Sequence, residues 1–197
     1  MLALFQDPHM LDSPRAWSRA GFEVTGDGQE SSIMVASHPS APGVLFKKYG
    51  KKIRLKDQLK NYQCRIEGAD KLRAFIAQRH LTKIVVPWKR LLEMPPDFDR
   101  KGTKAHVLVV EQLPILSNTE SKRCYHDIDR ETLRQLCEVL HTFRGLDSGV
   151  RNVPFTRNGQ IAFIDTERWK EDRERAWMRR ICEYLSTDGR HYAERLG

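Results

Sequence analysis

The sequence lacks the long apolar segments and paired cysteines that mark several large classes of protein. No apolar run approaches the roughly 18–20 residues that a membrane span needs, so we expect no transmembrane segment. Cys64, Cys124, Cys137 and Cys182 are widely spaced and form no C-x-x-C pair. This spacing predicts neither a cysteine-rich metal site nor a disulfide framework, and it favours a reducing compartment such as the cytoplasm. The N-terminal MLALFQDPHM has no basic region before its short apolar start, which is not the pattern of a Sec signal peptide.

Acidic residues are outnumbered by basic ones, 26 Asp and Glu against 34 Lys and Arg, which gives a formal net charge of +8. Hydrophobic residues make up 40% of the chain, which is enough for a core and argues against disorder. The positive charge admits nucleic acid, an acidic membrane surface, phosphates or an acidic protein as partners. Its densest part, residues 47–60, is interpreted either as a solvated face or as a patch that contacts an acidic partner, nucleic acid or inositol phosphate.

Hydrophobic periodicity predicts a mixed order of strands and helices, which is typical of an α+β protein. Three short strands separated by turn residues indicate an antiparallel meander, and a long helix follows them. A broken strand, a further strand, a helix, a turn, a short strand and a charged C-terminal helix complete the chain. The expected strands are 22–25, 33–36, 44–49, 84–87 with 91–94, 106–110 and 161–164; the expected helices are 55–79, 132–143 and 169–186, and the turn is 157–159.

The most informative segment carries Asp147, then Asn152 five residues later, then Asp165 thirteen residues after that. Asp165 ends an apolar strand that follows the turn. Phosphoryl transfer from a nucleotide needs a carboxylate near the acceptor hydroxyl and two oxygen-donor side chains that hold Mg²⁺ on the phosphates. A loop with Asp and Asn, joined by a hairpin to a second Asp, is expected to bring these three groups together.

This segment resembles the protein-kinase-like family, whose catalytic loop has the form D-x-x-x-x-N and whose metal-binding Asp follows on the next strand. The resemblance implies that Asp147 orients or deprotonates the acceptor hydroxyl. It implies that Asn152 and Asp165 hold Mg²⁺, with Mn²⁺ as an alternative, and that the phosphate donor is ATP.

The N-terminal half carries further elements of the family pattern. Gly26, Gly28 and Ser31 precede Ile33 as G-x-G-x-x-S-x-I between two predicted strands, which resembles the loop over the phosphates with Ser in place of the third Gly. Ile33 stands at the apolar position over the adenine. Lys47 resembles the phosphate-anchoring Lys, and Lys48 is the competing choice; Lys47 is preferred because Leu45, on its face of the strand, suits the roof of a nucleotide site.

The strand at residues 108–113 resembles the hinge strand of the family, with Val110 as gatekeeper and with backbone groups from Glu111 to Leu113 facing the adenine. The family also places a helical acid beside the phosphate-binding Lys. Glu67 is the first choice for that acid, and Asp70 is the second.

The chain departs from the usual protein-kinase pattern at several positions. Gly145 and Leu146 stand where many members have His-Arg, and Gly149 stands where a Lys commonly contacts the transferring phosphate; Arg151 or Arg144 is a candidate for that charge. Asp165-Thr166-Glu167 replaces Asp-Phe-Gly, which leaves open whether activity is retained. Few residues follow Asp165, so the peptide-docking platform of an ordinary kinase is not expected.

The sequence thus predicts a two-lobed, protein-kinase-like fold with a five-stranded antiparallel N-lobe sheet, one main N-lobe helix and a reduced, mainly helical C-lobe. The expected divisions are an N-terminal extension at 1–19, an N-lobe and hinge at 20–113, and a C-lobe at 114–197.

The expected function is an ATP-dependent Ser/Thr protein kinase of bacterial effector type. Such an effector could also be secreted into a host cell cytosol. The alternatives are a small-molecule kinase and a catalytically weak pseudokinase that binds a nucleotide or a protein. We expect a monomer with a protein substrate or an acidic activator, and no nucleic acid partner.

Overall fold

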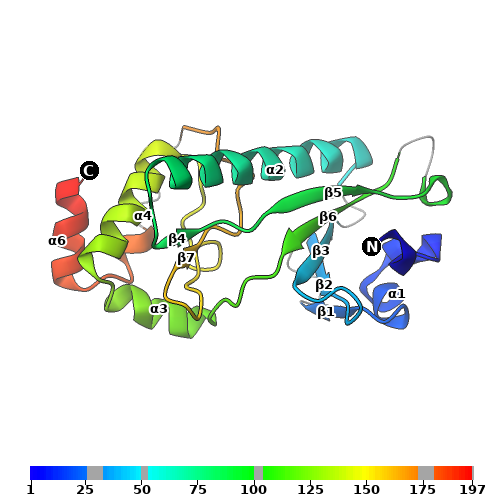
Figure 1. Cartoon of the computed structure of the whole chain (residues 1–197), viewed down its shortest axis with the longest axis horizontal. Coiled ribbons are helices and arrows are strands. Elements are labelled where there is room, and N and C mark those ends of the chain that lie inside the picture. Colours follow the sequence, from blue (N-terminus) through cyan, green and yellow to red (C-terminus); the bar gives the residue numbers. More distant parts are fainter. Residues whose placement is uncertain (26–32, 50–52, 100–103, 173–179, 197) are drawn as a thin grey trace. The chain divides into compact units, whose positions relative to one another are not determined.

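The computed structural model describes the chain except for residues 26–32, 50–52, 100–103, 173–179 and 197, and it divides the chain into two compact units. The first unit comprises Met1–Gln63 and Trp88–Gln112, and the second comprises Cys64–Pro87 and Leu113–Gly197. Each unit is described by itself below. The predicted mixed α+β class is confirmed (Figure 1).

The first unit is built on a five-stranded antiparallel sheet. Its strands are β1 (Glu23–Thr25), β2 (Ile33–Ser37), β3 (Val44–Tyr49), β5 (Lys89–Glu93) and β6 (His106–Glu111), in the order β1-β2-β3-β6-β5. The predicted meander β1-β2-β3 is therefore confirmed. The turn before β3 ends at Gly43, whose φ of +79° suits glycine better than any L side chain.

The first 19 residues belong to the core of this unit. They form two 3₁₀ turns, η1 (Leu2–Leu4) and η2 (Pro8–Asp12), and the helix α1 (Pro14–Arg19). The Ser13 side chain accepts a hydrogen bond from the Ala16 amide and so caps α1. Phe5 is buried with its ring centroid 5.7 Å from that of Phe46 in β3, and Trp17 is buried against Phe5 and Phe22. The N-terminal segment therefore covers one face of the sheet rather than extending from it.

The helix α2 (Leu55–Gln78) contributes its first nine residues to the first unit and the rest to the second, and it agrees with the predicted helix. The second unit also contains α3 (Asn118–His126), α4 (Arg130–Thr142) and α6 (Thr187–Leu196). Ser117 and Glu120 form a capping box at the start of α3, and Asp129 caps α4. The sequence analysis did not identify α3, although Ser-x-x-Glu at its start is the signal that marks it.

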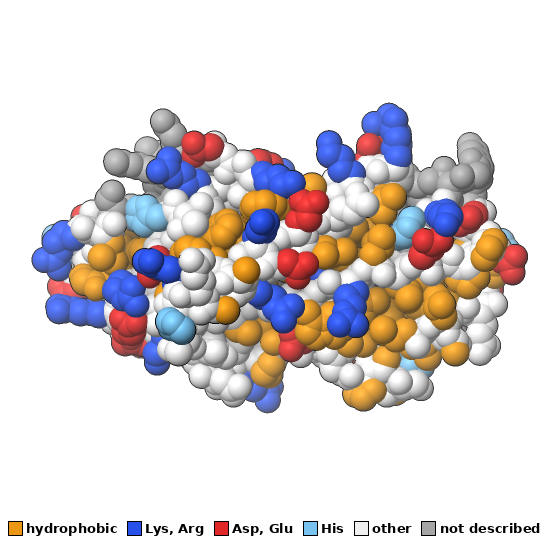
Figure 2. All heavy atoms as spheres, turned by 45° about the horizontal axis from the view of Figure 1, so that its top comes forward, with side chains coloured by type: hydrophobic (Ala, Val, Ile, Leu, Met, Phe, Trp, Pro, Cys, Tyr) orange, Lys and Arg blue, Asp and Glu red, His pale blue; other side chains and the backbone are white. Residues whose placement is uncertain are grey.

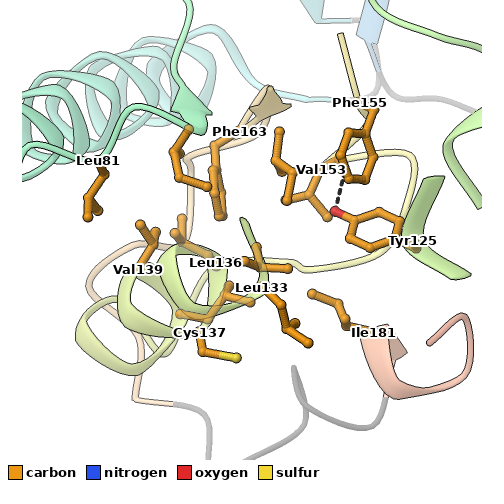
Figure 3. Close-up of a cluster of buried hydrophobic side chains, with 14 of the residues drawn as sticks. Leu81, Tyr125, Leu133, Leu136, Cys137, Val139, Val153, Phe155, Phe163 and Ile181 are labelled. Atoms are coloured by element: carbon orange, nitrogen blue, oxygen red, sulfur yellow. Dashed lines mark hydrogen bonds between the residues drawn. The ribbon is translucent and has the colours of Figure 1, made fainter. Parts of the chain in front are cut away.

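The core of the second unit lies between α4 and the segments that flank the candidate site (Figure 3). Leu133, Leu136 and Val139 of α4 belong to one cluster with Val153 and Phe163, and all five side chains are buried. Their spacing along α4 places them on one helical stripe, and burying each such side chain contributes about 1.5–3 kcal/mol. This packing fixes the chain on both sides of the predicted turn.

A buried tyrosine ties α3 to this core. The Tyr125 hydroxyl donates a hydrogen bond of 2.6 Å to the Val153 carbonyl oxygen (Figure 3). Burial raises the pKa of Tyr125, so the phenol stays protonated and remains a donor. The bond satisfies two polar groups that would otherwise be buried without partners.

Two predicted elements are corrected. Residues 84–87 and 91–94 are not one broken strand, because β4 (Ile84–Val85) pairs in parallel with β7 (Ile161–Ala162) in the second unit, whereas β5 lies in the sheet of the first. Pro87 interrupts the chain between them, since it has no amide proton for a sheet. The helix predicted at 169–186 is corrected at its start, because residues 167–170 lie in a turn; residues 180–182 within it are helical, and residues 173–179 lie outside the described part of the chain. The helix α6 that follows it was not predicted.

Acidic and basic side chains are interspersed on the surface shown in Figure 2. The basic run at 47–60 is not a uniform charged face: Lys48 is buried and donates to Gln58 Oε1 at 2.5 Å, and Arg54 pairs with Asp57, while Lys56 and Lys60 are exposed. Among the described helices, none is long and apolar enough to cross a membrane.

Candidate functional site

An antiparallel hairpin brings Asn152 and Asp165 together. The Asn152 carbonyl accepts a hydrogen bond of 3.0 Å from the Ile164 amide, and the Pro154 carbonyl accepts one of 2.8 Å from the Ala162 amide. The chain reverses at the predicted turn, where Gly159 has a φ of +76°. Because Asp165 follows Ile164 directly, its backbone lies beside that of Asn152.

The loop before the hairpin alternates buried and outward side chains. Leu146, Val150 and Val153 are buried in the core of the second unit, while Asp147 and Asn152 are half-buried. Asp147 Oδ1 accepts a hydrogen bond of 3.0 Å from the Gly149 amide, which fixes the local turn. The apolar residues anchor the loop, and the polar ones stay at its surface.

The two carboxylates are held in the same way, each through one oxygen. Asp147 Oδ1 also accepts from Arg180 Nη1 at 2.7 Å. Asp165 Oδ1 lies 3.0 Å from Arg65 Nη1 and accepts from the Glu167 amide at 3.2 Å. Within the described part of the chain, neither Oδ2 atom has a hydrogen bond or an ion pair. Each carboxylate therefore has one anchored oxygen and one that is available to a ligand.

Asp147 and Asp165 line one cavity of about 280 Å³ in the second unit. Every described residue that lines it is charged, which suits a polar ligand and not an apolar one. The lining residues are Asp147, Asp165, Glu167, Arg168 and Arg180.

Arg65 of α2 is the side chain that orients the chain beyond the hairpin. It is 8% exposed and contacts both Asp165 and Glu167, and its backbone carbonyl accepts a hydrogen bond of 2.6 Å from the Thr166 hydroxyl. The sequence analysis missed Arg65. It shares a helical stripe with Ala69 and Leu72, at i, i+4 and i+7, and a charge on a buried stripe is the signal that identifies it.

Two glycines make room for the segment that follows Asp165. A Cβ on Gly68 would lie 2.2 Å from the Thr166 carbonyl oxygen, and a Cβ on Gly145 would lie 1.9 Å from that of Arg168. Real Cβ contacts essentially never come so close. Glycine is therefore required at position 145 by close backbone approach.

The donor set around the hairpin suits a hard divalent cation. Carboxylate and amide oxygens are the protein ligands that Mg²⁺ and Mn²⁺ accept, and Asn152 and Asp165 supply one of each. The described residues contain no cluster of three or more His, Cys, Asp or Glu side chains that could hold a metal by itself. A cation at Asn152 and Asp165 would therefore need further ligands, which the phosphates of a nucleotide can provide.

A second cavity, of about 510 Å³, opens beside the same loop; it shares Asp147 with the first cavity and is also lined by Asn152. Arg151 lines it, whereas Arg144 lies 3.7 Å from Asp172 in a loose ion pair. Of the two cations considered in place of the usual Lys, Arg151 is the one that shares a cavity with Asp147. Among the described residues, the lining consists of Asn118, Lys122, Asp147, Gly149, Val150, Arg151, Asn152, Arg180, Glu183 and Tyr184.

In the first unit, the apolar residues predicted to contact a nucleotide share one face of the sheet with Lys47. Leu45 is paired with Val110 and Lys47 with Leu108, and residues paired in an antiparallel register point to the same side. Ile33 belongs to this face through its pairing with Tyr49. Lys48 points to the opposite face, which the buried Phe46 shares. Lys47 thus shares a face with Leu45 and Val110, and the choice between Lys47 and Lys48 stays a prediction.

Some backbone amides predicted to contact the adenine already donate hydrogen bonds within the protein. The residues predicted to cover the phosphates lie outside the described part of the chain. The Glu111 amide donates to the Trp88 carbonyl and the Gln112 amide to that of Gly43, so an adenine could not use either proton without displacing them. Within the described part of the chain, the Leu113 amide donates no hydrogen bond. Gly26, Gly28 and Ser31 are among the residues that the structure does not describe.

The acids predicted to pair with Lys47 are both exposed. Glu67 forms an ion pair of 2.7 Å with Lys170 in the second unit, and the Glu67 carboxylate raises the pKa of Lys170. Asp70 is exposed on the same helix. Pairing of either acid with Lys47 stays a prediction.

Neither the known protein families nor the curated proteins include a match to this chain. We therefore infer function from the geometry of the hairpin and from the motif resemblance.

Proposed function

We propose that this protein is an ATP-dependent phosphotransferase that acts on a hydroxyl group. The single observation that carries the proposal is the hairpin that places Asn152 beside Asp165 while Asp147 stands at the start of the same loop. Both carboxylates keep one oxygen available within the described chain. This arrangement supports the resemblance to the protein-kinase-like family, because spacing in the sequence and proximity in the fold point to the same three residues.

The nucleotide is proposed to contact the face of the first unit that carries Ile33, Leu45, Lys47 and Val110. Lys47 would bind its phosphates as a point charge. Asn152 and Asp165 would hold Mg²⁺ or Mn²⁺. The cation would supply charge neutralisation for the phosphates.

The reaction moves one phosphoryl group and one proton. The bond between the γ-phosphorus of ATP and the oxygen that bridges it to the β-phosphate breaks, and a bond from the acceptor oxygen to that phosphorus forms. The acceptor hydroxyl proton passes to the Asp147 carboxylate, and ADP leaves. Asp147 is anchored through Oδ1 by Gly149 and Arg180, so its Oδ2 is the oxygen proposed to face the hydroxyl.

The first candidate for the acceptor is a Ser or Thr hydroxyl of a protein. The second candidate is a small-molecule acceptor, and the cavity of about 510 Å³ beside Asp147 favours it. Such a volume lies in the range of small-ligand pockets, roughly 300–1,000 Å³.

Nucleotide binding is the first test. Thermal unfolding of the whole chain is measured with ATP, with and without Mg²⁺ or Mn²⁺, for the wild type, for Asp165→Asn and for Asp127→Asn. Asp127 is an exposed acid at the end of α3 and serves as the matched control. We expect a metal-dependent rise in melting temperature for the wild type and for Asp127→Asn, and a reduced one for Asp165→Asn. No rise with any nucleotide and metal would remove the proposal.

A further inference from the structure

The cavity of about 510 Å³ beside Asp147 has a composition that the phosphotransferase proposal does not by itself explain. We propose that it binds the acceptor, and that the acceptor is a small polyol carrying a phosphate group. The inference rests on the proposed function for the chemistry of transfer, but binding of such a molecule can be tested separately.

Two cations are available to a phosphate in this cavity. Lys122 projects from α3, where its Nζ lies 5.2 Å from the centroid of the Tyr184 ring, and Arg151 belongs to the loop that carries Asp147. Within the described part of the chain, neither side chain has an ion-pair partner. The third cation, Arg180, is already bound to Asp147.

Lys122 and Arg151 are exposed and line the same cavity, so one anion could contact both. A phosphate monoester offers several acceptor oxygens and about two negative charges, which suit one Arg and one Lys. The Lys122–Tyr184 contact also keeps the Lys122 ammonium beside the cavity by a cation–π interaction. The basic side of the site is therefore suited to a phosphate.

The remaining lining is suited to hydroxyl groups. Asn118 supplies an amide, Glu183 supplies a carboxylate, and Asp147 supplies the oxygen proposed to take the acceptor proton. Glu183 would repel a bare phosphate, whereas it can accept a hydrogen bond from a polyol. A molecule with a phosphate at one end and hydroxyls at the other satisfies both parts of the lining.

The cavity beside Asp147 also differs in its structure from the surfaces that bind extended peptides. Extended peptides bind along sheet edges or long grooves, where their main-chain groups are paired. The residues lining this cavity come from α3, the loop at 147–152 and residues 180–184, and no named strand contributes to it. The shape and lining therefore favour a small phosphorylated polyol over a polypeptide.

The test compares each polyol with its own phosphate ester. Binding of glucose and glucose 6-phosphate, and of myo-inositol and inositol 1-phosphate, is measured by calorimetry on the whole chain. The variants are Lys122→Ala, Lys122→Gln, Arg151→Ala and, as control, Arg123→Ala, which removes an exposed cation of α3 that does not line the cavity. We expect at least one ester to bind tenfold or more tightly than its parent polyol, and each cavity variant to reduce that ratio about tenfold, with Arg123→Ala unchanged.

Transfer from radiolabelled ATP to the same compounds, and to a phosphoserine peptide, separates this inference from the proposed function. An ester that binds through Lys122 and Arg151 but receives no label keeps the acceptor site and overturns the phosphotransferase. Label on peptides or on unphosphorylated polyols, with no preference for the esters, keeps the phosphotransferase and overturns the acceptor. Equal binding of esters and polyols, or equal loss with Arg123→Ala, overturns the acceptor as well.

Discussion

Arg65 Nη1 lies 3.0 Å from Asp165 Oδ1, so the carboxylate proposed to hold a metal cation already contacts a protein cation. Arg65 is 8% exposed, whereas the Asp165 side chain is 32% exposed. The pair thus joins a buried helix position to a carboxylate that reaches solvent. It orients Asp165 while leaving Oδ2 accessible.

Replacing Arg65 by Met should destabilise the protein while keeping much of the side-chain volume. The change leaves Asp165 and Glu167 facing each other without their shared cation. Buried pairs cost about 3–5 kcal/mol to break and exposed pairs about 0–1, and this half-exposed case should cost about 2 kcal/mol. Urea unfolding gives the free energy. Arg54→Met removes the exposed pair with Asp57 and should cost less than about 1 kcal/mol; an equal loss in both variants contradicts a special role for Arg65.

Gly145→Ala should disturb the segment after Asp165. Its Cβ would lie 1.9 Å from the Arg168 carbonyl and 2.4 Å from that of Glu171, and backbone atoms cannot give way cheaply. We expect a loss of about 2 kcal/mol or more in the free energy of unfolding. Gly189→Ala in α6 is the comparison, because its nearest contact is 3.3 Å and Ala favours helix. A wild-type stability for Gly145→Ala would show that this segment is not packed as described.

Tyr125→Phe should cost about 1–2 kcal/mol, because the buried Val153 carbonyl loses its donor. The loss is measured by urea unfolding near neutral pH. Tyr192→Phe, on the half-buried surface of α6, should change stability by less than about 0.5 kcal/mol. Equal stabilities of Tyr125→Phe and the wild type would mean that water or another group reaches the carbonyl.

Alkaline pH should destabilise the protein partly through Cys137. Burial raises the pKa of its thiol to about 12, from about 9 in the unfolded chain. The unfolded state therefore releases this proton first, and stability is full below pH 9 and is lost as the pH rises toward 12. Between pH 8 and 10 the contribution is about 1 kcal/mol. Cys137→Ala should remove that part of the pH dependence, and parallel wild-type and variant curves would refute the assignment.

Much of the first unit could be predicted, because its signals are local. Period-two alternation and turn residues located β1, β2, β3 and β6 to within a residue or two. The separation of β4 from β5 could not be predicted, because which sheet a short strand joins depends on distant partners such as Ile161.

In the candidate site, too, local features could be predicted from the sequence, whereas contacts between distant residues could not. The spacing of Asp147, Asn152 and Asp165 and the turn before the last Asp indicated a hairpin, and the structure forms it. The arginines that hold the two acids were not foreseen. Arg65 lies 100 residues before Asp165, and Arg180 contacts Asp147 from a later segment, so only the fold brings them together.

The most direct test of the central claim measures transfer of label from γ-³²P-ATP with Mg²⁺ to the phosphorylated polyols and to cell lysate, together with nucleotide binding. The wild type, Asp147→Asn, Asp165→Asn and Asp127→Asn are compared. The account predicts transfer by the wild type and by Asp127→Asn. It predicts binding without transfer for Asp147→Asn, and loss of metal-dependent binding for Asp165→Asn. Transfer that persists in both Asp147→Asn and Asp165→Asn would contradict it.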